Sequence, residues 1–306
     1  MLKNYPKVQH MGTRYTKKIF DDTVEITEKL DGSQFRFGLL DNHLMCCSKG
    51  SVLSLDTTDG LFKPAVTTCK QLFEDGLLDK DFVYIGETLS KGKHNCITYT
   101  NVPLGHISLF AVYDKKDDTW LRHCDLKNIA DHLNIDYVRL LKMLPTLTEE
   151  EKINIDTILE KLLDTESQLG GSKIEGFVVK NLFREVMVGD LPVPFIQGKF
   201  VSEKFKEKMG SKRKNRGQGW AHFMESYKTE ARWNKSIQHL REEGKLQHSP
   251  VDIGDLIAEI KRDIAEECGE EIKDFLWKYY GAVLLRNSTH GFPEYYKTLL
   301  LKEGLL

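Results

Sequence analysis

The sequence lacks the features that mark membrane, secreted and disulfide-rich proteins. No apolar run approaches the roughly 18 residues of a membrane-spanning helix, and the first residues lead into no apolar stretch of a secretory signal. None of the six cysteines belongs to a Cys-x-x-Cys pair, so we expect reduced thiols rather than a zinc or disulfide framework. These absences predict a cytoplasmic protein that binds no membrane.

An overall excess of either charge is also lacking, but one segment is strongly basic. The chain has 44 basic and 46 acidic residues, whereas residues 199–216 contain eight basic and two acidic side chains. Such a cluster is typical of a nucleic-acid contact and also of a solvated linker. The nucleic-acid-binding candidates of this segment are Lys204, Lys206, Lys212, Arg213, Lys214 and Arg216.

Hydrophobic periodicity indicates a mixed first part of the chain. With 306 residues, 40% of them hydrophobic and 29% charged, the composition suits a soluble protein of two domains. Helices are predicted at 67–75, 124–133 and 149–165. Period-two patterns predict strands at 23–30, 35–39, 82–86, 107–113, 176–179 and 195–201. This mixture is typical of an α+β domain with antiparallel sheets.

After residue 219 the pattern becomes helical. A polar stretch with glycines at 210–219 predicts a hinge. Ser249 and Pro250 form a helix start that precedes an apolar face. Two further helices are predicted at 271–286 and 293–302. The last part of the chain is therefore predicted to be a small all-α domain.

The pattern Lys29-Leu30-Asp31-Gly32, or KxDG, is the first candidate for chemistry. Asp-Gly between two strands favours a hairpin turn, and the pattern arises by chance in about one chain of this size in fifteen. In a chemical interpretation, Lys29 is a nucleophile toward a nucleotide α-phosphate, which requires its amine to lose a proton. Taken alone, the pattern leaves both interpretations open.

Further polar residues follow at the ends of predicted strands, in a characteristic order. Glu87 closes a Tyr-Ile-Gly-Glu stretch, and a Phe-Ala-Val-Tyr-Asp stretch ends at Asp114. A Glu-Gly-Phe-Val-Val-Lys stretch runs from Glu175 to Lys180, and Lys199 completes the series. Together with KxDG, this order resembles the covalent nucleotidyltransferases, which are the ATP-dependent DNA and RNA ligases and the mRNA capping enzymes.

Within these enzymes the chain looks most like the phage RNA ligase 2 branch. The opening Tyr5-Pro-Lys-Val-Gln-His, the Lys-Phe-Val-Ser-Glu-Lys-Phe run that starts at Lys199, and a helical C-terminal region in place of an OB barrel carry that resemblance. It implies a nucleotidyltransferase domain of antiparallel sheets with flanking helices at 1–209, a basic hinge at 210–219 and a helical domain at 220–306.

The resemblance also implies an activity. The protein would be an ATP-dependent RNA ligase that joins 3′-hydroxyl and 5′-phosphate ends through lysyl-AMP and an adenylylated 5′ end. It would use ATP and Mg²⁺ or Mn²⁺, bind RNA, act as a monomer, and could be encoded by a phage or virus. A DNA ligase, an mRNA capping guanylyltransferase, and a non-catalytic RNA-binding protein with the same fold stay open as alternatives.

The family's roles fall on particular residues of this chain. Lys29 would carry AMP, while Lys180 and Lys199 would hold phosphates as the other catalytic residues. Glu175 would position the metal through its water shell. The remaining nucleotide contacts would come from Glu28 at the adenine edge, Tyr113 or, as second choice, Phe110 stacked on adenine, Glu87 at the ribose, and Lys49 at the ribose or the RNA end.

Two positions depart from the pattern of the branch. Gln34 stands where asparagine is frequent, and Gln197 stands where the first lysine of the last motif is usual. Lys204 would compensate for Gln197 if the chain turned back toward the site.

Overall fold

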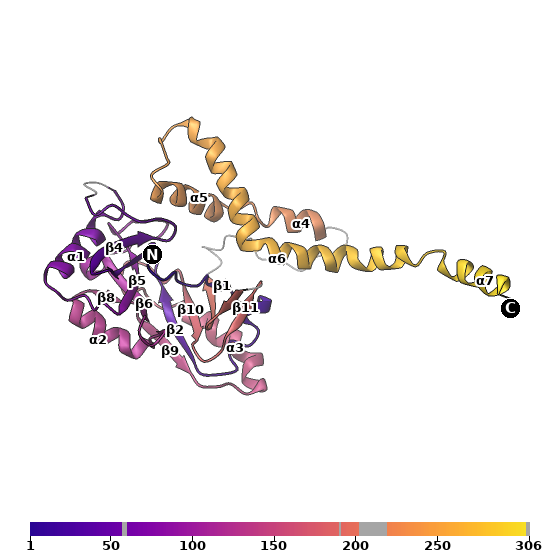
Figure 1. The fold of residues 1–306 in the computed structure, drawn as a ribbon, viewed down its shortest axis with the longest axis horizontal. Helices are drawn as coiled ribbons and strands as arrows, with labels where there is room; N and C mark the ends of the chain where they lie inside the picture. The colour runs from indigo at the N-terminus through magenta and orange to yellow at the C-terminus, as the bar shows by residue number, and fades with distance from the viewer. Residues whose placement is uncertain (57–59, 190, 202–218, 304–306) are drawn as a thin grey trace. The chain divides into compact units, whose positions relative to one another are not determined.

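The computed structural model describes residues 1–56, 60–189, 191–201 and 219–303. The chain forms two compact units, Met1–Leu246 and Gln247–Leu306. Sheets of mostly antiparallel strands with flanking helices make up the first unit, and the second is helical (Figure 1). The predicted α+β class is therefore confirmed. The expected hinge at 210–219 lies almost entirely outside the described residues, so the predicted domain boundaries stay a prediction.

A five-stranded sheet carries the KxDG lysine. Its strands lie in the order β1-β13-β10-β2-β9, and every pairing is antiparallel except that of β1 with β13. The bounds are β1 (Gln9–His10), β13 (Ile196–Val201), β10 (Gly176–Asn181), β2 (Val24–Lys29) and β9 (Leu140–Leu144). A separate hairpin consists of β11 (Val186–Val188) and β12 (Leu191–Val193).

The two faces of this sheet differ because successive side chains of a strand point to opposite sides. Val24 and Ile26 of β2 are fully buried and pack with α3 (Glu149–Leu162). Lys29, an odd-numbered residue of the same strand, therefore lies on the other face. In β10, Phe177 belongs to the same core as Ile26, which places Lys180 on the face of Lys29.

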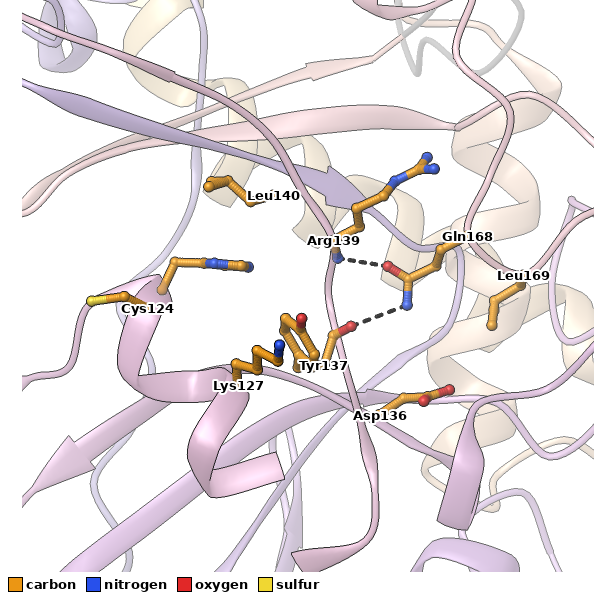
Figure 2. Close-up of a pocket in the computed structure, with 9 residues that line it drawn as sticks. Cys124, Lys127, Asp136, Tyr137, Arg139, Leu140, Gln168 and Leu169 are labelled. Atoms are coloured by element: carbon orange, nitrogen blue, oxygen red, sulfur yellow. Dashed lines mark hydrogen bonds between the residues drawn. The ribbon is translucent and has the colours of Figure 1, made fainter. Parts of the chain in front are cut away.

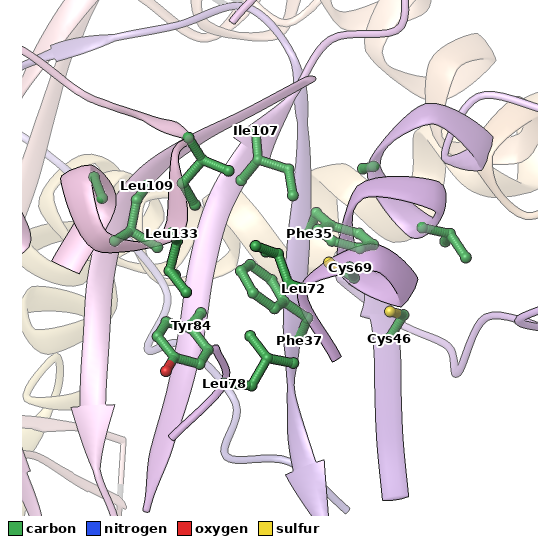
Figure 3. Close-up of a cluster of buried hydrophobic side chains, with 14 of the residues drawn as sticks. Phe35, Phe37, Cys46, Cys69, Leu72, Leu78, Tyr84, Ile107, Leu109 and Leu133 are labelled. Atoms are coloured by element: carbon green, nitrogen blue, oxygen red, sulfur yellow. The ribbon is translucent and has the colours of Figure 1, made fainter. Parts of the chain in front are cut away.

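A six-stranded sheet supplies the other wall of the first unit. Two helices cover one of its faces through a core that includes Phe35, Phe37 and Leu109 (Figure 3). Its strands are β4 (His43–Ser48), β3 (Ser33–Leu40), β5 (Phe82–Thr88), β6 (Ile107–Asp114) and β7 (Thr119–Trp120) in that order, with β8 (Asp136–Tyr137) beside β6. The covering helices are α1 (Lys63–Glu74) and α2 (His123–Leu133).

The KxDG turn joins the two sheets. β2 ends at Lys29 in the five-stranded sheet, and β3 begins at Ser33 in the six-stranded one, so the turn is not a hairpin. A Cβ on Gly32 would lie 2.6 Å from the Thr88 carbonyl oxygen and 2.7 Å from Glu87 Cγ. Glycine is required here because β5 passes so close to the turn.

The helices after residue 218 belong to both units. α4 (Gly219–Glu225) and α5 (Glu230–Glu242) lie in the first unit, while α6 (Ile253–Ser288) and α7 (Phe292–Lys302) lie in the second. The prediction of a separate helix at 271–286 is wrong, because α6 runs unbroken through Gly269. A single glycine costs a helix only about 1 kcal/mol, and the flanking residues are good helix formers.

All six cysteines have free thiols, and Cys96 and Cys124 are exposed. No helix within the described part of the chain is long and apolar enough to span a membrane.

Candidate active site

The amine of Lys29 and the carboxylate of Glu175 form the centre of the candidate site. Glu175 directly precedes β10, whose first residue, Gly176, lies opposite Lys29 in the strand pairing. Lys29 Nζ donates a hydrogen bond of 2.6 Å to Glu175 Oε2, and the two side chains are 28% and 12% exposed. One strand pairing thus brings together two motif residues that are 146 positions apart.

Three carboxylates hold the Lys29 amine in its charged form. Burial acts to lower the pKa of Lys29, but the charges of Glu175, Glu87 and Asp31 outweigh burial and raise this pKa above its ordinary value. An ammonium group cannot act as a nucleophile. Attack by Lys29 therefore requires that this negative charge be neutralised.

Glu87 contributes a second buried carboxylate from β5 in the six-stranded sheet. Burial raises the pKa of Glu87 to about 8, with Lys29 opposing the shift and the charges of Glu175 and Glu242 adding to it. Burial also raises the pKa of Glu175, opposed by Lys29 and, more weakly, by Lys199. The two carboxylates occupy a buried region that is short of positive charge, which is a suitable environment for a cation.

Asp31 of the KxDG pattern fixes the turn after Lys29. Its Oδ2 atom accepts the backbone N–H groups of Cys96 and Ile97, each at 2.7 Å. The Asp31 backbone N–H donates to the Tyr99 hydroxyl at 2.9 Å. Asp31 therefore attaches the turn to residues 96–99, a segment that no sequence motif had singled out.

Lys180 lies at the far end of β10 from Glu175. Its Nζ atom donates a hydrogen bond of 2.6 Å to the Phe110 carbonyl and lies 5.6 Å from the Tyr5 ring centroid. Burial lowers the pKa of Lys180 to about 8, with Glu25 opposing. A lysine that is buried without a carboxylate hydrogen bond can hold an incoming phosphate strongly, because its charge is poorly solvated.

Gln197 and Lys199 lie on β13, opposite Lys180 and Val178 of β10. The Gln197 side chain accepts a 2.7 Å hydrogen bond from the Tyr5 hydroxyl and donates one of 2.7 Å to the Pro6 carbonyl. Gln197, which stands where the resembled branch usually has a lysine, thus holds the N-terminal segment against β13.

The two aromatic candidates occupy different surroundings. Tyr113 is buried, donates from its hydroxyl to Asp118, and lies 5.2 Å from Trp120 between ring centroids. Phe110 lies at an irregularity in the pairing of β5 with β6 and has Lys180 Nζ 5.5 Å from its ring centroid. Phe110 is therefore closer to the phosphate-binding candidates, and stacking by Tyr113 stays a prediction.

Glu28 lies on the opposite face of β2 from Lys29. Its carboxylate accepts hydrogen bonds from the Ser167 hydroxyl at 2.5 Å, the Gln168 N–H at 3.0 Å and Arg139 at 3.2 Å. Burial raises the pKa of Glu28 although these donors oppose the shift. In this structure Glu28 secures the loop at 166–168, and its contact with adenine stays a prediction.

A pocket of about 630 Å³ adjoins these partners of Glu28. Figure 2 shows Arg139 and Gln168 beside it, with Gln168 bonded to the Arg139 N–H at 2.6 Å and to the Tyr137 carbonyl at 3.1 Å. The lining residues are His123, Cys124, Lys127, Asp136, Tyr137, Arg139, Leu140, Gln168 and Leu169. The pocket contains none of the predicted phosphate-binding residues.

The basic candidates are only partly described. Lys49 follows β4, is exposed, and acts to lower the pKa of Glu242 in α5. The other six, Lys204, Lys206, Lys212, Arg213, Lys214 and Arg216, lie outside the described residues.

Helix α5 reaches the KxDG turn, which no motif indicated. Gln238 donates to the Gly32 carbonyl at 3.1 Å, and Glu242 accepts a hydrogen bond from the Ser33 hydroxyl. Burial raises the pKa of Glu242, and its charge contributes to the raised pKa of Glu87. The only sequence signal for α5 was helical periodicity, which does not say where a helix packs.

Solved structures of an RNA ligase from Naegleria gruberi are similar to this chain. A mutant with ATP and Mn has 18% identity, a TM-score of 0.48, and covers 66% of this chain and 57% of its own. The form with PPi has 18% identity, a TM-score of 0.49 and coverages of 67% and 57%. The chain therefore spans less than two thirds of the length of these proteins.

The comparison with protein families is more decisive. No curated protein matches the chain. A family model described as RNA ligase matches residues 22–191, which is more than half of the 306 residues and includes Lys29, Glu87, Glu175 and Lys180. The chain therefore belongs to the RNA ligase family.

Proposed function

We propose that the protein is an ATP-dependent RNA ligase that joins 3′-hydroxyl and 5′-phosphate ends through a lysyl-AMP intermediate. The observation that carries this proposal is the ion pair of Lys29 with Glu175, beside Glu87, at the turn that joins the two sheets. A lysine placed among carboxylates can change between a protonated and a nucleophilic form as that charge is neutralised. Membership of the RNA ligase family supports the same chemistry.

In the first step, Lys29 transfers AMP to itself from ATP. Lys29 Nζ, after losing a proton, forms a bond to the α-phosphorus while the bond from that phosphorus to the bridging oxygen breaks and pyrophosphate leaves. Lys180 and Lys199 hold the phosphate oxygens, on which negative charge increases. ATP is the proposed donor because the ligases that this chain resembles are ATP-dependent. A similar solved structure of an RNA ligase also contains ATP and Mn.

The site suits a divalent cation that is bound by protein carboxylates and nucleotide phosphates together. The described residues hold no cluster of three or more His, Cys, Asp or Glu side chains that could bind a metal ion by themselves. Glu175 and Glu87 offer two buried carboxylates with raised pKa values, and Mg²⁺ commonly binds through one or two carboxylates, water and substrate phosphates. When bound, Mg²⁺ or Mn²⁺ would supply positive charge that favours the neutral Lys29 amine.

The later steps use the same residues. An oxygen of the RNA 5′-phosphate forms a bond to the AMP phosphorus, the bond to Lys29 Nζ breaks, and the amine regains a proton. The RNA 3′-hydroxyl oxygen then attacks the 5′-phosphate, loses its proton, and AMP leaves. Protonation of the Lys29 nitrogen makes it a better leaving group from the AMP phosphorus, and the negative charges of Glu175, Glu87 and Asp31 favour that protonation.

Incubation with α-labelled ATP tests the proposal. Wild-type protein should acquire one labelled AMP, and Lys29→Ala should acquire none, as measured by intact mass. Sealing of a nicked RNA duplex should require the same lysine. Label from GTP but not ATP would indicate a capping enzyme, sealing confined to DNA would indicate a DNA ligase, and absence of any label would indicate a binding protein.

The proposal also covers the oligomeric state, the cellular location and the origin of the protein. We propose that the protein is a monomer, acts in the cytoplasm and is encoded by a phage or virus. Size-exclusion chromatography with light scattering tests the monomer, since a mass near twice 35.3 kDa would show a dimer.

A further inference from the structure

A second polar cavity, of about 340 Å³, lies between residues 93–96 and helix α5 in the first unit. Besides one apolar side chain, its lining consists of polar groups: Lys93, Asn95, Cys96, Asn234, Gln238 and Arg241. No acidic residue among those that the structure describes lines it. None of these residues had been assigned a role by the motifs, so the cavity needs its own explanation.

The walls of the cavity are fastened to the turn that carries the nucleophile. Asn95 Nδ2 and Gln238 Nε2, from opposite walls, both donate to the Gly32 carbonyl oxygen, at 2.8 Å and 3.1 Å. The Cys96 N–H donates to Asp31 at 2.7 Å. The cavity is therefore adjacent to the turn at Asp31 and Gly32 that follows Lys29.

A directional chain of hydrogen bonds fixes α5 in this position. The Ser90 N–H donates to His94 Nδ1 at 3.0 Å, so the proton of the neutral imidazole is on Nε2. Nε2 then donates to the Ser33 hydroxyl at 2.9 Å, and that hydroxyl donates to Glu242 of α5. Burial, with Lys91 and Arg241 adding, lowers the pKa of His94 to about 4 despite Asp31. The imidazole is therefore neutral at pH 7, as this chain requires.

The chemistry of the lining selects an anion. Lys93 and Arg241 are cations, and the amides of Asn95 and Asn234 supply further N–H donors, whereas Gln238 Nε2 already donates to Gly32 and Glu242. Phosphate oxygens are the common partners of such sets in nucleic-acid-binding proteins. The walls are already held by hydrogen bonds to the turn, so little ordering is needed when the anion binds.

We propose that this cavity binds a backbone phosphate of the RNA next to the end being joined. The inference rests on the proposed ligase function and deepens it, because it assigns α5 to the RNA-binding surface. The pyrophosphate of ATP is a poorer occupant for a geometric reason. In-line attack places pyrophosphate on the far side of the α-phosphorus from Lys29, whereas this cavity adjoins the turn of Lys29 itself.

Binding of a short 5′-phosphorylated RNA, measured by fluorescence anisotropy without ATP, gives the first test. Lys93→Ala and Arg241→Gln should each weaken binding about tenfold, as expected for one lost charge-assisted contact. The slope of log affinity against log salt should decrease by about 1 in each. Lys91→Ala is the matched control, since it removes the same charge from the same loop but does not line the cavity, and should change binding less than about twofold.

Cysteine protection in the wild-type protein needs no substitution. Cys96 lines this cavity and Cys124 lines the other pocket, and both are exposed. Saturating RNA should slow alkylation of Cys96 by N-ethylmaleimide at least about fivefold, because a bound phosphate covers the thiol, while Cys124 alkylates as before. Equal rates at Cys96 with and without RNA would overturn the proposal.

The outcomes separate this inference from the proposed function. If wild-type protein acquires no AMP, the ligase function has failed. If it acquires AMP and seals RNA, but Lys93→Ala and Arg241→Gln bind RNA as Lys91→Ala does, only the cavity proposal has failed. If those two variants raise the KM for ATP and leave RNA affinity at the wild-type value, the cavity holds the triphosphate and the proposal is overturned.

Discussion

The two compact units bury their apolar side chains to very different extents. In Met1–Leu246, Phe35, Phe37 and Phe177 are completely inaccessible within cores that join strands and helices far apart in the sequence. In Gln247–Leu306, α6 buries only Glu259, Cys268 and Gly281 of its 36 residues, and α7 buries none. The first unit is therefore held by long-range packing, and the helices of the second by local hydrogen bonds along each helix.

The difference explains where the chemistry lies. Burial is the main cause that raises the pKa of Glu87 and lowers that of Lys180, and only a packed interior provides it. The second unit presents aromatic side chains to solvent, with Trp277 62% exposed. The described residues of the second unit therefore do not provide the buried environment that shifts the pKa values of acids and bases.

The largest difference between the units should appear in the rate of AMP attachment when a glutamate of each unit is replaced by glutamine. Glu175→Gln removes a buried carboxylate that we propose binds the divalent cation at the phosphates, and should lower the rate of AMP attachment at least about a hundredfold. Glu294→Gln in α7 should change it less than about twofold. Quench-flow measurement of labelled protein from α-labelled ATP gives both rates. Equal rates in the two variants would remove Glu175 from the site.

The next effect concerns stability. Phe177→Ala creates a cavity in the core beneath β10 and should lower the free energy of unfolding by about 3–5 kcal/mol. Trp277→Ala, at an exposed position of α6, should lower it by less than about 0.5 kcal/mol. Urea unfolding followed by circular dichroism measures both. A large loss in Trp277→Ala would show that α6 packs against a core after all.

A pH experiment should show a smaller effect. The pKa of Glu87 is raised to about 8 in the folded protein, from about 4.3 in an unfolded chain. The stability from this group is present below about pH 4 and is lost as the pH rises to about 8. Between about pH 5 and 8, the Tm of the nucleotide-free wild type should fall roughly 2–4 °C more than that of Glu87→Gln. Parallel Tm curves would mean that Glu87 is ionised throughout.

The smallest effect is expected on removing the second unit. A chain that ends at Leu246 keeps α5 and every described contact of the candidate site, so AMP attachment should stay within about twofold of the full chain. The same labelling assay measures it, with circular dichroism as a control for folding. A tenfold lower rate in a folded truncation would place part of the site in residues 247–306.

Strand periodicity and the order of motifs predicted Lys29 near a strand end and Glu175 at the start of another strand. They did not predict that these two strands pair, which the structure shows. The KxDG turn, however, was compatible with a hairpin, because a turn motif does not specify whether the flanking strands share a sheet. The structure puts them in different sheets, and Gly32 serves close approach rather than a left-handed backbone.

Features that depend on long-range packing could not be predicted. The irregular pairing of β6 with β5 places Phe110 and Tyr113 in different surroundings. A period-two hydrophobic pattern in the sequence does not reveal such an irregularity. The partners of Glu28 come from residues 139–168, which carry no motif. The hydrogen bonds of α5 to the turn depend on polar residues that resemble any solvated helix face.

The crossing of the chain between the sheets at Lys29 has a mechanical consequence. Residues 30–32 link the two sheets covalently, so the sheets cannot separate at this point. At the other end of β10, Lys180 of one sheet donates to the Phe110 carbonyl of the other, and a phosphate can replace that carbonyl. Any movement of one sheet relative to the other would therefore be smallest beside residues 30–32, so the reacting amine of Lys29, which directly precedes them, would be displaced least when a nucleotide enters.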